Sequence, residues 1–206
     1  MQVRENIDLG AKVSDSQFMC ISTLPENFNF HNCTGYWYDV AYNHVTEKTE
    51  RIGDSFNIIV ESIGRLVAGL FRSDPAFRGI QQWAIGVGSS SWDALWDTDS
   101  PPTALSTATR LTNEIGRLPI SIAGHESSMI YVDQDGEPSQ TPTNRIKVSR
   151  MFGRADGNGE WREFALFGGN AGSARDSGIM INHKIHRVIN KTGDMTVERN
   201  IIFTFN

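Results

Sequence analysis

The chain has little of what marks several large classes of protein. It holds two cysteines among 206 residues, Cys20 and Cys33, and they lack the C-x-x-C spacing of redox and zinc motifs. We therefore expect reduced thiols and no disulfide framework. No apolar run approaches the roughly 20 residues that span a bilayer, and the N-terminal segment lacks the apolar core of a signal peptide. These absences favour a protein made in the cytoplasm, with no membrane insertion.

Positive charge is also scarce. The chain has 19 Lys and Arg residues against 24 Asp and Glu residues, a formal charge of -5, and it contains no basic run. Without a basic patch to meet phosphates, nucleic acid is not an expected partner. Hydrophobic residues make up 39% of the chain and charged residues 21%, which is typical of a protein that folds around a core.

Motifs for catalysis and metal binding are missing as well. The acidic segments 133–137 and 156–160 lack the spacing of a calcium-binding loop, and their Asp-Gly and Asn-Gly pairs favour plain hairpin turns. His183 and His186 are three residues apart in a predicted strand, which places them on opposite faces of a sheet. No G-x-S-x-G elbow or Cys/His pair is present to activate a nucleophile. We expect no metal, no cofactor and no catalysis.

The spacing of apolar residues predicts one α-helix. Asp54 and Ser55 offer N-cap oxygens, and apolar residues then recur at intervals of three and four from Phe56 to Phe71. The helix should stop near Ser73, because Pro75 disfavours helical geometry in the residue before it. We expect this helix to dock on a sheet.

From Gln82 onward, short β-prone runs alternate with turn residues, as in a sandwich or barrel. The clearest run is Met195 to Phe205, in which apolar and polar side chains alternate. Arg199 interrupts its apolar face and Ile202 interrupts its polar face, so Ile202 is a candidate contact with a neighbouring subunit. The predicted strands are Trp83–Val87, Leu118–Ala123, Met129–Val132, Arg145–Phe152, Trp161–Phe167, Ile179–Val188 and Met195–Phe205.

Two regions follow from these patterns. Residues 1–53 show no sustained periodicity and are predicted to form an extended N-terminal arm or assembly segment. Residues 54–206 are predicted to form an antiparallel β-sandwich with one docked α-helix. The predicted fold class is therefore mainly β.

One loop combines aromatic and acidic residues, namely Trp92, Asp93, Trp96 and Asp97, before the Pro101-Pro102 pair. Indole faces stack on sugar rings and carboxylates accept sugar hydroxyls, so this loop is a candidate glycan site. Tryptophan is also enriched in interface cores. The same indoles could therefore anchor the loop to its own domain or to a neighbour, and both interpretations stay open.

The order of several segments resembles that of tail proteins of tailed bacteriophages and prophages. The predicted helix leads into an "AIGxG" strand and then into a loop with the pattern "P-T … L-x-x-E-x-x-R", followed by β strands. The likeness covers about Asp54 to Phe205. The segments that carry it are Ile80–Gly88, Pro101–Thr103, Leu111–Arg117, Glu163–Gly169, Gly178–Asn182, Lys191–Thr192 and Ile201–Phe205.

The resemblance implies a structural subunit of a phage tail, at the baseplate, fibre base or neck. Other tail proteins would be its partners, the virion its location, and a homo-oligomer its assembly state, since tail parts follow the symmetry of the tail. One alternative is a receptor-binding module that recognises a host-surface glycan through the tryptophan loop. Another is a glycan-degrading enzyme, which would need two carboxylates about 5 to 10 Å apart in a cleft.

Overall fold

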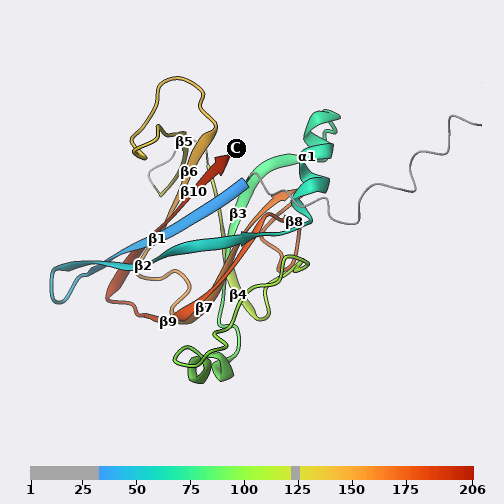
Figure 1. Cartoon of the computed structure of the whole chain (residues 1–206). Coiled ribbons are helices and arrows are strands. Elements are labelled where there is room, and N and C mark those ends of the chain that lie inside the picture. Colours follow the sequence, from blue (N-terminus) through green and yellow to red (C-terminus); the bar gives the residue numbers. More distant parts are fainter. Residues whose placement is uncertain (1–32, 122–125) are drawn as a thin grey trace, which may run out of the picture.

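The computed structural model describes residues 33–121 and 126–206, which form a mainly β, antiparallel fold with one short α-helix (Figure 1). The part of the predicted arm before residue 33, including Cys20, lies outside the described residues. The elements are β1 (Cys33–Asn43), β2 (Lys48–Ile59), α1 (Ile63–Phe71), β3 (Arg78–Gly86), the 3-10 helix η2 (Ser90–Leu95), β4 (Glu114–Pro119), β5 (Ser127–Tyr131), β6 (Arg145–Phe152), β7 (Gly159–Gly169), β8 (Ile179–Met180), β9 (Asn182–Lys191) and β10 (Met195–Phe205).

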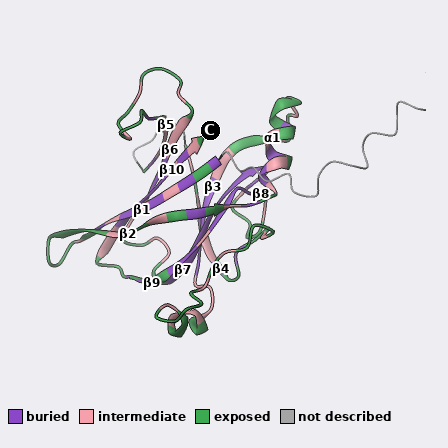
Figure 2. Ribbon diagram, viewed as in Figure 1, coloured by how far each residue is buried: buried purple, intermediate pink, exposed green. Residues whose placement is uncertain are grey.

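The strands form one antiparallel sheet in the order β4-β3-β7-β9-β2-β1-β10-β6-β5, with β8 paired to β7. The sheet curls into a half-barrel. One part contains β4, β3, β7 and β9, the other contains β2, β1, β10, β6 and β5, and the main core lies between them. Aromatic side chains from both parts meet there, and Figure 2 shows the buried residues along the strands. The mainly β, antiparallel class with one helix is confirmed. The two layers that the sequence predicted as a sandwich are parts of a continuous sheet, joined where β2 meets β9.

Strand β10 has the bounds that the sequence predicted. It pairs with β1 along its whole length and with β6 from Val197 to Thr204. Val197, Ile201 and Phe203 are buried, as their shared face predicts. Arg199 also points to this face and is fully buried.

The prediction of an arm up to residue 53 is wrong for residues 33–53, which form β1 and part of β2. Strand β1 lies between β2 and β10, so it is a central strand of the sheet. Its alternation was hidden because Tyr36 and Tyr38 point outward while Asp39 is buried. The predicted domain boundary at residue 53 falls inside β2.

The predicted helix begins too early in the sequence. Residues 56–59 belong to β2, where Phe56 pairs with Tyr36 and Ile58 pairs with His183. Strand pairing therefore overrides the helical spacing of these residues. Helix α1 starts at Ile63 and ends at Phe71, near the predicted stop. No helix in the described parts of the chain has the length and apolarity that crossing a membrane requires.

The helix packs against the end of the sheet. Ile63 and Leu66 are buried in the main core, whereas Phe71 is exposed. Gly69 allows close approach to Phe77, because a Cβ there would lie 2.3 Å from the Phe77 ring. The Oγ of Ser62 donates a hydrogen bond to the Met180 carbonyl at 2.7 Å, which ties the start of the helix to β8.

Both acidic segments form turns, as predicted. The Asp133 carboxylate accepts hydrogen bonds from the backbone N–H groups of Asp135 and Glu137, each at 2.9 Å. Gly136 and Gly157 have φ angles of 87° and 58°, which favour glycine. Within residues 33–121 and 126–206, no group of three or more His, Cys, Asp and Glu side chains is placed to hold a metal ion.

Candidate binding groove

The segment between β3 and β4, residues 87–113, covers the outer face of β3, β7 and β9 and carries the predicted tryptophan loop (Figure 1). A second, smaller core lies beneath it, in which Leu111 from this segment packs with side chains of the sheet. The buried members of this core are Val60, Ala84, Leu111, Ala165, Phe167, Ala171 and Met180. This segment and the sheet form the walls of the candidate site.

The two predicted carboxylates, Asp93 and Asp97, are both held by arginines. Asp93 accepts hydrogen bonds from Nε and Nη2 of Arg162 on β7, at 2.9 and 2.6 Å. Asp97 accepts one from Nη2 of Arg187 on β9, at 2.7 Å. These hydrogen bonds lower the pKa of both carboxyls. The two side chains thus anchor the loop to the sheet, which supports the packing interpretation for them.

The two indoles are half-buried and line open clefts. The Trp92 ring packs on Gly88, where a Cβ would lie 2.1 Å from a ring atom. Trp96 lies beside Arg187, whose guanidinium carbon is 5.7 Å from the ring centroid. The Nε1 donor of Trp96 is buried and has no hydrogen-bond partner among the described residues. The indoles therefore face the clefts rather than the core, as the ligand interpretation requires.

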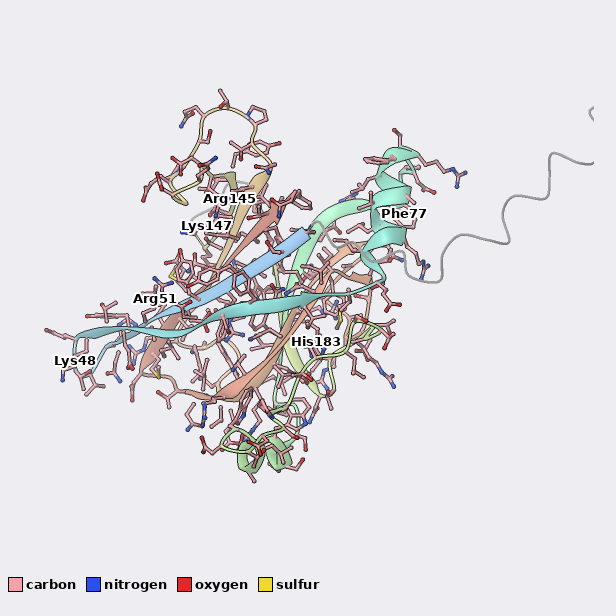
Figure 3. The ribbon with its side chains drawn as sticks, viewed as in Figure 1. Lys48, Arg51, Phe77, Arg145, Lys147 and His183 are labelled. Atoms are coloured by element: carbon pink, nitrogen blue, oxygen red, sulfur yellow. The ribbon has the colours of Figure 1, made fainter. Side chains whose placement is uncertain are left out.

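Three clefts adjoin one another along β9, and together we call them the groove. The largest has a volume of about 430 Å³ and opens between β2 and β9. Trp96 and Lys184 also line the second cleft, of about 220 Å³. Pro102 and His183 are shared by the second cleft and the third, of about 330 Å³, which Trp92 lines. Figure 3 labels His183 in this part of the molecule.

The groove exists because β2 and β9 pair only briefly. Their ladder consists of Ile58 with His183 and Ile59 with Asn182. Beyond this ladder, the pairing of β2 with β1 is irregular at Gly53, whose φ angle is 69°. The pairing of β9 with β7 is irregular as well, because residues 186–188 of β9 lie opposite a single residue of β7, Arg162. Extra residues of this kind bend a strand and end its pairing. The strands consequently diverge and leave the largest cleft between them.

Cations outnumber acids along the groove. Lys184, Arg187 and Arg110 line it, and Asp54 is the acidic side chain among its described lining residues. Asp54 already accepts a hydrogen bond from Tyr36 and pairs with Arg51. Burial lowers the pKa of Lys184, whose Nζ donates to the Phe56 carbonyl at 2.7 Å. Its position links the two walls of the groove.

The buried carboxylate of Glu163 holds the end of the segment between β3 and β4 in place on the sheet. Glu163 accepts hydrogen bonds from the backbone N–H groups of Thr112 at 3.0 Å and Asn113 at 2.8 Å. Its other contact is Nε2 of His183, at 3.0 Å. Burial alone would raise the pKa of Glu163, but the hydrogen bonds lower it below the ordinary value. Gly86 leaves room for this side chain, because a Cβ there would lie 2.6 Å from a Glu163 oxygen.

A buried ion pair between Glu114 and Arg117 holds the loop after β7. Glu114 and Arg117 on β4 form two hydrogen bonds, at 2.6 and 2.7 Å. Nη1 of Arg117 also donates to the carbonyls of Gly172 and Ser177, at 3.3 and 2.9 Å. The guanidinium carbon lies 4.5 Å from the ring centroid of Phe167. Arg117 thereby links strand β4, the loop and the second core.

The main core contains an ion pair that the sequence did not reveal. Arg199 donates to Asp39 from Nε at 3.0 Å and from Nη2 at 2.7 Å, and neither residue is exposed. The guanidinium carbon lies 5.4, 5.0 and 4.5 Å from the rings of Trp37, Trp161 and Phe164. The break at Arg199 in an apolar strand face was a visible signal. Its partner was hidden in a segment that was interpreted as an arm.

The two histidines of β9 contact different groups, as their spacing predicts. His183 contacts Glu163, whereas His186 stacks on Trp37 with ring centroids 5.0 Å apart. Nδ1 of His186 lies 2.7 Å from the Arg187 carbonyl, and Nε2 lies 3.4 Å from Nη2 of Arg199. Burial lowers the pKa of His186 well below its ordinary value, with the neighbouring Arg199 charge as a further cause. His186 is therefore neutral in the folded protein.

Ile202, the remaining predicted site residue, does not line the groove. It is on the outer face of β10, level with Tyr36 of β1 and Lys147 of β6, and is partly exposed. A Cβ on Gly136 would lie 3.6 Å from it, so the turn after β5 approaches this residue. Figure 3 labels Lys147 on β6. Contact of Ile202 with a neighbouring subunit stays a prediction.

Comparison of the chain with models of protein families, with curated proteins and with solved structures finds no match. The resemblance to phage tail proteins therefore stays a prediction from sequence motifs. The geometry of the groove and the contacts of the motif residues are the structural features that bear on function.

Proposed function

We propose that the chain is a structural subunit of a bacteriophage tail, located at the baseplate, fibre base or neck, where it assembles with other tail proteins without catalysing a reaction. It would work within the virion as a homo-oligomer. The proposal combines the order of sequence motifs with two properties of the structure. The first is how the motif residues are used, and the second is what the surface leaves exposed.

The use of the motif residues carries the proposal. Gly86 of the "AIGxG" strand leaves space for Glu163, which binds the backbone of Thr112 and Asn113 in the next motif. Glu114 and Arg117 of the same motif hold the loop that leads to β8. These polar side chains form hydrogen bonds and ion pairs that hold loops on the sheet. Such use supports a scaffold rather than a reaction centre.

The exposed surface supports assembly. Phe56 and Leu105 are each 67% exposed and line the groove, together with other apolar side chains. Contiguous apolar surface of this kind marks interaction sites in soluble proteins. A subunit that is covered by neighbours in a tail would bury this surface.

Deletion of the gene in the phage or prophage that encodes the chain tests the proposal. We expect particles with absent or incomplete tails, and recovery of complete tails when the gene is supplied in trans. Normal tails and normal infectivity after the deletion would refute a structural role in the tail.

A receptor-binding module is the second candidate, and one observation favours it. Both indoles of the tryptophan loop line open clefts rather than the core. A host-surface glycan could stack on them. Binding of the purified chain to a glycan array, lost when Trp96 is replaced by alanine, would support this candidate. Tail assembly that proceeds normally in the same variant would separate it from the structural role.

A further inference from the structure

Exposed apolar side chains are concentrated along the groove. In the described parts of the chain, 11 large apolar residues are exposed, and five of them line the three clefts. The five are Phe56, Ile58, Leu95, Leu105 and Val188. They come from β2, η2, the segment before β4, and β9. A folded chain that gathers them in one depression has an apolar surface suited to a partner.

The charges of the groove favour a partner of opposite sign. Lys184, Arg187 and Arg110 line the clefts, but Lys184 donates to the Phe56 carbonyl and Arg187 pairs with Asp97. The Asp54 carboxylate is likewise occupied by Tyr36 and Arg51, which leaves Arg110 as the lining charge with no partner among the described residues. Arg110 is exposed at the wall of the third cleft. Interfaces place complementary charges opposite each other, which selects partners and speeds their encounter. An acidic side chain of the partner would meet Arg110.

The groove also holds a donor that needs an acceptor. Trp96 is one of the residues that line both the first and the second cleft, and its Nε1 group is buried without a hydrogen-bond partner among the described residues. A buried N–H group without a partner loses free energy relative to a satisfied one. Because the atom itself has no contact with solvent, an oxygen of a bound segment would reach it only when the Trp96 ring turns toward the groove.

We infer that the groove binds an extended segment of a partner protein, with apolar side chains interspersed with acidic ones. This inference deepens the proposed function, on which it rests, by stating the chemistry of the partner. An extended segment fits because the clefts adjoin one another, the second and third at residues 183–185 of β9 and the first over residues 184–189. A peptide fits better than a glycan because the lining is mainly apolar and because Arg162 and Arg187 already hold Asp93 and Asp97.

Selection of short random peptides on the full chain tests the inference, even while the partner is unidentified. We expect enrichment of peptides that combine apolar and acidic residues. Replacement of Phe56 or Leu105 by serine should weaken binding of an enriched peptide by about tenfold or more. Both residues are largely exposed, so neither replacement should disturb the fold. The Phe71→Ser variant is the matched control, since Phe71 is 87% exposed on α1 and does not line the groove.

A charge reversal sharpens the test, because Arg110→Glu should weaken the acidic peptides and leave uncharged variants of them unaffected. Four results would overturn the inference: no enriched peptide family, equal loss in the Phe71→Ser control, groove-dependent binding of a glycan in place of peptides, or self-association that Phe56→Ser abolishes. The presence of the chain in purified tails is measured separately. Failure of the groove and failure of the tail role are therefore distinguishable.

Discussion

Single residues show how much of the core depends on paired polar groups. Asp39 and Arg199 are fully buried among aromatic rings, and the Trp37 Nε1 group donates to Asp39 at 2.6 Å. Burying a charge is costly unless a partner and hydrogen bonds compensate it. The two residues therefore depend on each other, although they lie 160 positions apart in the chain.

Replacement of Arg199 by methionine should destabilise the protein strongly. The change leaves the Asp39 carboxylate buried without its partner, which typically reduces the free energy of unfolding by about 3 to 5 kcal/mol. The double variant Asp39→Leu/Arg199→Met should recover most of the loss, because it removes both charges. Urea denaturation measures all three proteins. A loss below about 1 kcal/mol in the single variant would contradict the buried pair.

His186 predicts a pH dependence of stability. Its pKa in the folded protein is well below the value of about 6.5 expected after unfolding. Between these two values the unfolded chain binds a proton that the folded chain does not, so stability falls as the pH decreases below about 7. The expected slope reaches about 1.4 kcal/mol per pH unit. The His186→Phe variant keeps an aromatic ring on Trp37 and should lack this slope between about pH 7 and pH 5. An unchanged slope would exclude His186 as its source.

Cys33 should be unreactive in the folded protein. It is buried at the start of β1, and burial raises the pKa of its thiol to about 11. Few thiolates are therefore present at neutral pH, and the sulfur is shielded from reagents. In a Cys20→Ser variant, a thiol reagent should modify Cys33 only after denaturation. Rapid modification of the native variant would show that β1 is not packed as described.

The elements differ in how far their sequences predict them. Strands β6 and β10 have the predicted bounds, and the apolar side chains that marked them in the sequence are buried at Val148, Phe152, Val197, Ile201 and Phe203. Strand β1 was missed because it carries aromatic residues outward and the Asp39 carboxylate inward. The start of α1 was misplaced because apolar residues at the end of β2 happen to follow a helical spacing. Pairing with β1 and β9 decides their structure, and local sequence does not contain that information.

The candidate site was predictable only in part. Trp92 and Trp96 line the groove, and their role in binding a ligand or a neighbour stays a prediction. The arginines that hold Asp93 and Asp97 lie 69 and 90 residues away in the sequence. Only the folded chain brings each arginine next to its carboxylate, so these pairs were not predictable from the sequence. The walls from β2 and β9 were hidden for the same reason. Ile202 points outward on β10, level with Tyr36 of β1 and Phe56 of β2, but it does not line the groove.

Gly53 lies at the irregularity in the pairing of β2 with β1. Its φ angle is 69°, and a Cβ would lie 2.1 Å from the Trp37 ring. Gly53→Ala should therefore reduce the free energy of unfolding by about 2 kcal/mol or more. Gly116→Ala on β4 is a matched control, because a Cβ there meets nothing within 4 Å. Thermal unfolding of the two variants compares them directly. Equal stability would mean that the irregularity in β2 tolerates a side chain.

The whole molecule combines a rigid frame with an open surface. Buried ion pairs and a continuous sheet fix the loops. Figure 2 shows that the buried residues lie mainly along the strands. Apolar side chains remain exposed in the groove between β2, β9 and the tryptophan loop. A scaffold with an uncovered apolar groove fits a protein that completes its surface by binding others.

Cryo-electron microscopy of tails purified from a phage whose genome carries this gene tests the proposed structural role most directly. The account predicts density for the β domain at positions that repeat with the symmetry of the tail, with a neighbouring protein over part of its surface. Tails that are complete and contain no density for this domain would contradict the account.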